Sequence, residues 1–137
     1  MHLKFPFVYA KVERFGRLFY PVIQLEIKTI FGWKKFDFLV DTGADATTLP
    51  STILPYLGIK TNKLTKSRTH GVGGISIDTF DAVVPLKIGE AILKVNVSIT
   101  TDNNTPFLLG RKDIFEERFS LLIDSKNKVT VLEENGL

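Results

Sequence analysis

The chain has 137 residues, of which 24% are charged and 44% are hydrophobic, and its net charge is +3, from 18 Lys and Arg and 15 Asp and Glu. These proportions exclude a disordered or collagen-like chain, and the length predicts a single domain over residues 1–137 whose core requires no disulfide or metal. The absence of cysteine excludes disulfides, cysteine nucleophiles and thiolate zinc sites, and the small positive charge does not indicate a nucleic-acid partner.

The sequence gives no sign of a membrane partner or a secretory signal. No apolar run reaches the ~18 residues that a membrane-spanning helix needs. The first apolar stretch is interrupted by Pro6, Lys11 and Glu13 before a signal-peptide core can form. We therefore expect a cytoplasmic protein that does not associate with membranes.

The first half of the chain is dominated by strand patterns. Ile23, Leu25 and Ile27 alternate with polar residues, which predicts a half-buried strand, and a second strand is predicted over Phe36–Val40. The segment Leu49–Leu54 predicts the start of a short helix. We expect Ser51 or Thr52 to cap the N-terminus of this helix and Gly58 to end it.

Further strands and one helix are predicted in the second half. Thr69–Phe80 has three glycines between strand-like flanks and predicts a mobile hairpin. Strands are predicted over Ala82–Ile88, Ala91–Ile99, Phe107–Leu109, Leu121–Ile123 and Val129–Leu132, with Gly89-Glu90 as a two-residue turn and a helix over Arg111–Phe119. The predicted fold class is all-β, mostly antiparallel, with one short C-terminal helix.

The segment Phe38–Asp45 carries the most chemical information. An apolar strand ends directly at Asp41, and a carboxylate there is costly unless it is hydrogen-bonded or paired. Thr42 can bond the local backbone, and Gly43 permits a tight turn that aims the carboxylate into a protected space. The same residues also fit an Asx-turn that only ends the strand. A metal site formed by aspartates spaced four residues apart would need a helix, which the strand pattern and Gly43 disfavour, so no metal is expected.

Three motifs in order make the sequence similar to the retropepsin-like (retroviral-type) aspartic protease family. They are two hydrophobic residues followed by Asp41-Thr42-Gly43-Ala44-Asp45 with Thr47, the glycine-rich Gly71-Val72-Gly73-Gly74-Ile75, and Thr105-Pro106-Phe107-Leu108-Leu109-Gly110-Arg111. The resemblance covers roughly residues 23–119. It implies a retropepsin-like half-barrel with a flap hairpin, and an aspartic endopeptidase that needs no cofactor and is inhibited by pepstatin-like molecules.

The resemblance also implies a role for each matching residue. Asp41 resembles the catalytic aspartate, Thr42 the hydroxyl that braces the paired loops, and Gly43 the residue whose backbone lies against substrate. The implied substrate-binding residues are Ala44, Asp45, Gly71, Val72, Gly73, Gly74, Ile75 and Leu108. The implied structural supports are Gly110 and Arg111, with Arg111 paired to Asp45.

Peptide hydrolysis by this route needs two carboxylates, which cannot both ionise at about 3 Å and therefore share one proton. The chain has one Asp-Thr/Ser-Gly, because Asp78-Thr79 and Asp124-Ser125 are followed by Phe80 and Lys126. We therefore expect a homodimer with one Asp41 per chain, acting on a peptide or protein bound as an extended strand. The family places the chain termini at the dimer interface, so Leu121–Ile123 and Val129–Leu132 are interface candidates, although these strands could instead close the chain's own core.

Two alternatives remain at the level of the sequence. The first is a catalytically silent retropepsin fold that serves as a dimerisation or peptide-binding module and keeps Asp-Thr-Gly for structural reasons. In its favour, Ala46 is less polar than its counterpart in some family members, and the chain ends match the family weakly. The second is a protease that is active only inside a larger polypeptide or on one dedicated precursor.

Overall fold

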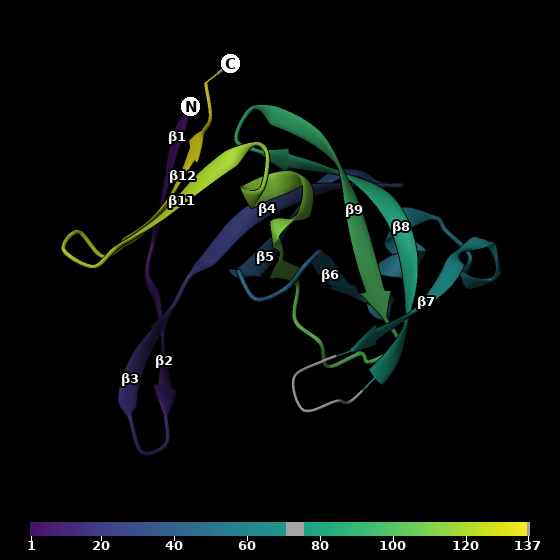
Figure 1. Ribbon diagram of the computed structural model, residues 1–137, viewed down its shortest axis with the longest axis horizontal. Helices are drawn as coiled ribbons and strands as arrows, with labels where there is room; N and C mark the ends of the chain where they lie inside the picture. The colour runs from purple at the N-terminus through teal and green to yellow at the C-terminus, as the bar shows by residue number, and fades with distance from the viewer. Residues whose placement is uncertain (71–75, 137) are drawn as a thin grey trace.

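Strands form most of the computed structural model, which describes residues 1–70 and 76–136. Figure 1 shows a curved sheet, a smaller sheet that contains both chain ends, and a hairpin that projects away from the rest. The strands are β1 (His2–Pro6), β2 (Val8–Val12), β3 (Gly16–Tyr20), β4 (Val22–Thr29), β5 (Gly32–Val40), β6 (Thr47–Pro50), β7 (Thr65–His70), β8 (Ser76–Ile88), β9 (Ala91–Thr100), β10 (Leu108–Leu109), β11 (Phe119–Asp124) and β12 (Val129–Glu134). The all-β prediction is therefore confirmed.

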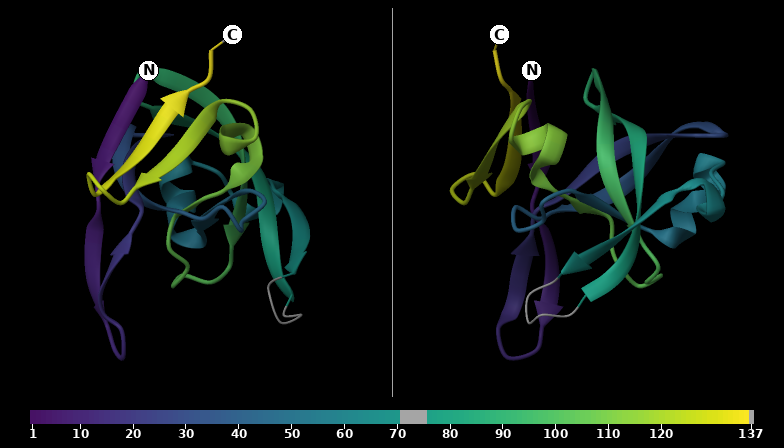
Figure 2. Two further views of the ribbon diagram at one scale, coloured as in Figure 1. Left: turned by 60° about the vertical axis from the view of Figure 1, so that its left-hand side comes forward. Right: turned by 45° about the vertical axis from the view of Figure 1, so that its right-hand side comes forward.

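The main sheet has the strand order β4-β5-β10-β6-β9-β8-β7. Most neighbours are antiparallel, but β10 runs parallel to β5 and β6 runs parallel to β9. A further pairing of β4 with β8, through Glu26 with Lys87 and Ile27 with Leu86, bends the sheet back on itself. The views in Figure 2 show the resulting half-barrel.

The core forms inside this half-barrel because the longer strands place alternate side chains on its inner face. In β4, Ile23, Leu25 and Ile27 are buried, as the sequence predicts. In β9, every second residue from Ala91 to Ile99 is buried. The β8–β9 turn is the predicted Gly89-Glu90, and Gly89 has the positive φ of +61° that a glycine-first turn requires.

The smaller sheet joins the two ends of the chain in the order β1-β12-β11. The predicted terminal hairpin is present as β11 and β12. Val131 and Leu132 of β12 are buried, so this strand closes the chain's own core. Leu122 and Ile123 of β11 are exposed, and their role in a dimer interface stays a prediction.

The helical segments differ in detail from those predicted. The short helix after β6 is present as η1 (Ser51–Ile53) and α1 (Leu54–Leu57), and it ends at Gly58, whose φ is +69°. Neither Ser51 nor Thr52 caps it; the Ser51 hydroxyl bonds the side chain of Asn103 instead. A third short helical turn is η2 (Thr61–Lys63).

The helix predicted over Arg111–Phe119 is reduced to a single interrupted turn, η3 (Arg111–Phe115). Lys112 has an extended backbone (φ −59°, ψ 134°), and Asp113 lies in the left-handed region with φ +68°. Phe119 is buried as the first residue of β11. Among the described residues, we find no helix long and apolar enough to span a membrane.

Candidate active site

Asp41 directly follows Val40, the last residue of β5. Two backbone hydrogen bonds to the β10 segment fix this end of the strand: Leu39 N donates to Phe107 O (2.8 Å), and Asp41 N donates to Leu109 O (3.0 Å). On its other side, Val40 N donates to Pro21 O (2.9 Å). The half-buried Asp41 is therefore held by backbone contacts from segments far away in the sequence.

The residues after Asp41 fold into a tight turn around its carboxylate. Gly43 N donates to Asp41 Oδ1 (3.0 Å), and Ala44 N donates to the backbone carbonyl of Asp41 (3.1 Å). A Cβ atom at Gly43 would lie 3.2 Å from Asp41 Oδ1, which is tighter than an ordinary contact. The turn thus has the form of the Asx-turn that the sequence allowed, and it fixes the direction of the carboxylate.

Arg111 braces this turn from outside, as the resemblance implied. Its Nη2 donates to Asp45 Oδ1 and its Nη1 to the carbonyl oxygen of Thr42, both at 2.6 Å. The backbone reinforces the contact, because Arg111 N donates to Ala44 O and Lys112 N donates to Asp45 O. One arginine thereby holds both ends of the segment 42–45.

Gly110 is placed where no side chain fits. A Cβ atom at this position would lie 2.3 Å from the carbonyl carbon of Ala46 and 2.7 Å from Thr47 N. Gly110 N donates to Thr47 Oγ1 (3.1 Å), and the Thr47 side chain is fully buried. The close approach of the two backbones is what brings Arg111 within reach of the Asp41 turn.

Asp113 anchors the interrupted turn that carries Arg111. Its Oδ2 accepts hydrogen bonds from Asn96 N (2.8 Å) and Asn96 Nδ2 (2.9 Å) of β9. Burial opposes ionisation of Asp113, but the two hydrogen bonds from Asn96 and the charge of Lys112 outweigh it, so the pKa of Asp113 is lower than its ordinary value. The ionised carboxylate therefore ties η3 to the main sheet.

The structure brings together Asp41, Thr42, Gly43, Ala44, Asp45, Gly110 and Arg111 from the predicted set. Leu108 is half-buried in β10, between Leu39 of β5 and Thr48 of β6. The predicted flap tip, Gly71–Ile75, lies outside the described residues, although β7 and β8 on either side of it pair as a hairpin. The functional roles of these residues stay predictions.

Two supports of the site were not recognised as such in the sequence. In the sequence, Thr47 is recognisable only as part of the motif that begins at Asp41, and nothing marks Asp113 as a support. A buried threonine after an Asp-Thr-Gly turn gives no local sign that it accepts from an amide 63 residues away. Asp113 has no sequence signal either, because its partner Asn96 looks like an ordinary exposed position of β9.

A comparison of the sequence with protein families adds a decisive observation to this geometry. Residues 27–117 match the family described as "gag-polyprotein putative aspartyl protease". The chain belongs to this retropepsin-like family. The match includes the Asp41 turn and the Gly110-Arg111 segment and excludes β1, β2, β3 and the terminal hairpin. No curated protein matches the chain significantly in sequence.

Two solved structures have the same fold as this chain. The chain resembles EIAV protease complexed with the inhibitor HBY-793, with a TM-score of 0.57 and 23% identity over 80% of this chain and 93% of that one. It also resembles a retropepsin-like aspartic protease from Rickettsia conorii, with a TM-score of 0.63 and 21% identity over 96% of this chain and 92% of that one. Family and fold together support aspartic protease function.

Other carboxylates of the chain have different surroundings from the Asp41 turn. Asp124 accepts hydrogen bonds from the backbone and side chain of Asn127, which lower its pKa and close the β11–β12 turn. Asp78 forms ion pairs with Lys66 and Arg68 on the β7–β8 hairpin. Within the described part of the chain, no three His, Asp or Glu side chains are grouped closely enough to hold a metal ion.

Proposed function

We propose that two copies of this chain form an aspartic endopeptidase in which each copy contributes one Asp41 carboxylate. The observation that carries the proposal is the Asp41 turn: a half-buried carboxylate at a strand end, fixed by Gly43 N and braced through Thr42 and Asp45 by Arg111. This arrangement holds one carboxylate in one direction. The hydrolysis requires a second, and family membership supports a second Asp41 as its source.

The proposed chemistry follows from the shared proton of such a pair. The ionised carboxylate removes a proton from a water molecule, and that water attacks the carbonyl carbon of the peptide bond. The protonated carboxylate gives its proton to the carbonyl oxygen, which yields a tetrahedral gem-diol. The carboxylate that took the proton from water then passes it to the amide nitrogen as the C–N bond breaks, and the other carboxylate takes back a hydroxyl proton as the new carboxylic acid forms. Substrate would lie as an extended strand between the Asp41 turn and the β7–β8 hairpin, with large hydrophobic side chains favoured on either side of the cleaved bond.

A peptide library provides the first test. The wild-type chain should cleave it between about pH 3 and about pH 7, and Asp41→Asn should lower the rate by at least ~10³-fold, because an amide cannot exchange the proton. Glu90→Gln is the matched control, since it makes the same carboxylate-to-amide change at the exposed β8–β9 turn. Equal cleavage by wild type and Asp41→Asn would contradict the proposal.

A mixing experiment tests the contribution of one carboxylate per chain. When Asp41→Asn protein is added to a fixed amount of wild type, mixed pairs with a single carboxylate form. For random pairing, activity per wild-type chain should fall in proportion to the wild-type fraction. Activity that does not change on mixing would show that one chain carries the whole centre.

The silent-module alternative predicts no cleavage in either experiment together with retained self-association or peptide binding. The expected cytoplasmic location stays a prediction.

A further inference from the structure

The hairpin of β2 and β3, here called the N-terminal arm (residues 8–20), stands apart from the rest of the protein. Its strands pair with each other from Val8 with Tyr20 to Val12 with Gly16, and within the described residues they belong to no other sheet. The arm projects from the same end of the molecule as the β7–β8 hairpin in every view of Figures 1 and 2. An isolated two-stranded hairpin is marginally stable in water, so a free arm of this kind needs another surface to pack against.

The two faces of the arm differ. One face carries Tyr9, Lys11, Arg17 and Phe19. On it, the Arg17 guanidinium lies over the Tyr9 ring at 4.7 Å, and the Phe19 ring stacks on Phe7, the residue before the arm, with ring centroids 4.0 Å apart.

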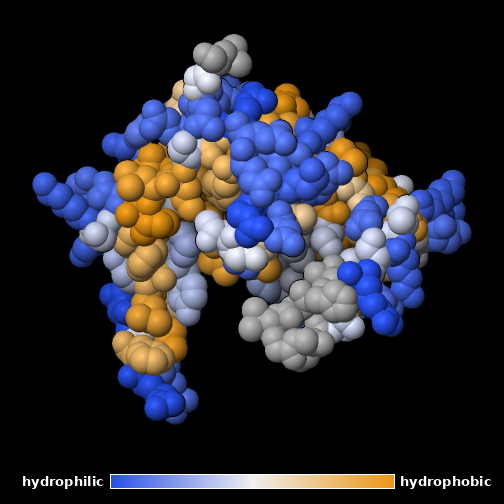
Figure 3. All heavy atoms as spheres, in the orientation of Figure 1, coloured by the Kyte–Doolittle hydropathy of each residue, from blue (hydrophilic) through white to orange (hydrophobic). Residues whose placement is uncertain are grey.

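The opposite face, here called the aliphatic face, is aliphatic except for Tyr20 at its base. The pairing register places Val8, Ala10, Val12, Leu18 and Tyr20 on it. Val8 and Leu18 are exposed, and so is Phe15 in the turn, with 72% of its surface accessible. Figure 3 shows hydrophobic residues along the arm on the side facing the viewer. Soluble chains rarely leave an apolar surface of this kind uncovered.

The base of the arm lies beside two parts of the chain that we place in the proposed dimer interface, the Asp41 turn and the β11–β12 hairpin. At one side, Pro21 O accepts from Val40 N, the residue before Asp41. At the other side, Phe7 N donates to Lys128 O in the β11–β12 turn. A second copy whose Asp41 meets the Asp41 of the first therefore lies beside the arm.

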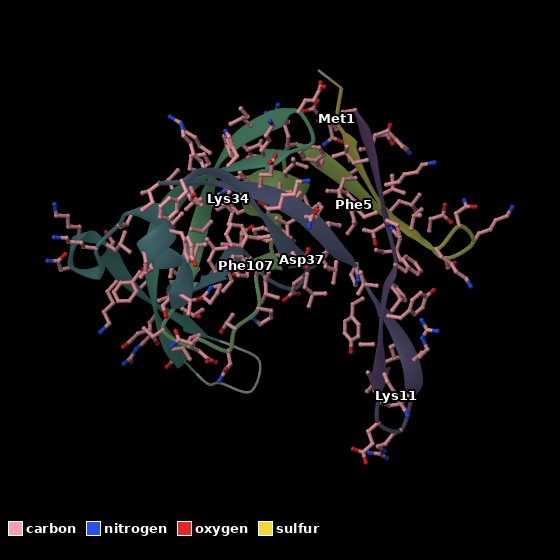
Figure 4. The ribbon with its side chains drawn as sticks, turned by 180° about the vertical axis from the view of Figure 1, so that it is seen from behind. Met1, Phe5, Lys11, Lys34, Asp37 and Phe107 are labelled. Carbon is pink, nitrogen blue, oxygen red and sulfur yellow. The ribbon has the colours of Figure 1, made fainter. Side chains whose placement is uncertain are left out.

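The arm does not fold back onto its own body. An open groove of about 430 Å³ lies at its base, between Phe5 and Val8 on one side and Val22 and Asp37 on the other. Figure 4 shows Phe5 and Asp37 near this base, and Lys11 far along the arm. The aliphatic face is therefore available to another molecule.

Charge favours a second copy of the same chain as that molecule. The arm contains Lys11, Arg14 and Arg17 against Glu13, which gives it a net charge of 3 − 1 = +2. The segment 36–50, which contains the Asp41 turn, has three aspartates and no basic residue. Arg111 pairs with Asp45, and within the described residues Asp37 and Asp41 form no ion pair. The arm of one copy and the Asp41 side of another are thus complementary in sign.

We propose that the N-terminal arm is a dimerisation clasp whose aliphatic face packs against a second copy of this chain, beside that copy's Asp41 turn. The inference rests on the proposed function, because it uses the dimer that the Asp41 pair requires. It adds a contact made by residues 8–20, which lie outside the family match over residues 27–117.

A pair of double variants tests the clasp. Phe15→Ser with Leu18→Ser removes two exposed apolar side chains from the arm, and Val83→Ser with Ile92→Ser removes two of similar total exposure from β8 and β9. In sedimentation experiments, the arm variant should weaken self-association by ~10-fold or more, and the control should stay within ~2-fold of wild type. Equal dissociation constants for the two variants, or a wild-type chain that remains monomeric, would overturn the clasp.

Hydrogen exchange tests the clasp independently of peptide cleavage. In the Asp41→Asn chain, the amides of residues 8–20 should become protected as protein concentration rises, whether or not the wild-type chain cleaves peptides. Protection that does not depend on concentration would contradict the clasp. If the wild-type chain cleaves no peptide but the amides of its arm are still protected on association, the proposed function is contradicted and the clasp is supported. Unchanged unfolding midpoints of the monomers would show that both double variants fold.

Discussion

Arg111 and Asp45 form a short ion pair whose two members differ greatly in exposure: 35% of the arginine side chain is accessible, against 95% of the aspartate side chain. The Asp45 carboxylate is thus almost fully solvated, and such a pair contributes little to stability by charge alone. The same guanidinium also donates to the carbonyl oxygen of Thr42. We infer that the arginine matters mainly because its planar donors hold two points of the Asp41 turn at once.

Substitutions at these two positions should therefore have unequal effects. Arg111→Ala should lower the free energy of unfolding by ~1–3 kcal/mol, because it removes both donors, whereas Asp45→Ala should lower it by less than ~1 kcal/mol. Arg111→Lys should not restore wild-type stability, because an ammonium lacks the planar donor pair. Urea unfolding of the three variants measures these differences. Equal losses for Arg111→Ala and Asp45→Ala would show that the ion pair itself dominates.

Gly110→Ala should be strongly destabilising. The added Cβ would lie 2.3 Å from the carbonyl carbon of Ala46, and backbone atoms cannot move away as a flexible side chain could. We expect a loss of about 3 kcal/mol or more in the free energy of unfolding. Gly136→Ala is the control, since no atom lies within 4 Å of its added Cβ. Thermal unfolding that is unchanged by Gly110→Ala would contradict the close backbone contact.

Gly43→Ala should separate activity from stability. Its Cβ would contact only the Asp41 carboxylate, at 3.2 Å, so the main effect should be a small displacement of that carboxylate. We expect the free energy of unfolding to change by less than ~1 kcal/mol and the rate of peptide cleavage to fall by about 10-fold or more. Parallel measurements of unfolding and kcat/KM provide the test. Full activity in the folded variant would mean that the direction of Asp41 is not set by this turn.

Asp113→Asn should reveal a pH-dependent contribution to stability. The folded-state pKa of Asp113 is lower than its ordinary value, so its stabilising effect is complete above that ordinary value and is lost as pH falls through the folded-state pKa. The variant should therefore be less stable than wild type by ~1–2 kcal/mol near neutral pH, and this difference should shrink in strong acid. Asparagine tolerates the positive φ of this position, so the backbone need not change. A stability difference that is constant with pH would exclude the ionised carboxylate as the cause.

The sequence was sufficient to predict most of the main sheet because its strands have one buried and one exposed face. In β4 and β9 this alternation is directly visible, and Gly89 marks the turn before β9. The arm was not predicted, for the opposite physical reason: both of its faces carry apolar residues, such as Tyr9 on one and Leu18 on the other. Because Tyr9 and Phe19 share their face with Lys11 and Arg17, the alternation of apolar and polar residues is too weak to predict a strand.

The helix predicted over Arg111–Phe119 shows how tertiary contacts override a local pattern. Ile114, Phe115 and Phe119 have helical spacing, but Phe119 is buried as part of a strand instead. The chain leaves the helical conformation at Lys112 and Asp113, where the carboxylate bonds Asn96. The positions of Asp41, Gly110 and Arg111 were predicted from three motifs, but the hydrogen bonds that join them depend on the completed fold.

The contact between Arg111 and Asp45 has a consequence for the order of events during folding. Its two residues are 66 positions apart, and the amide of Gly110 reaches Thr47 across 63 positions. Closing such long loops costs more entropy than closing a local hairpin such as β8–β9, so we expect these contacts to form after it. A chain emerging from the ribosome lacks the brace of the Asp41 turn until residue 111 has been released, so the turn acquires its final geometry only when nearly the whole domain is available to fold.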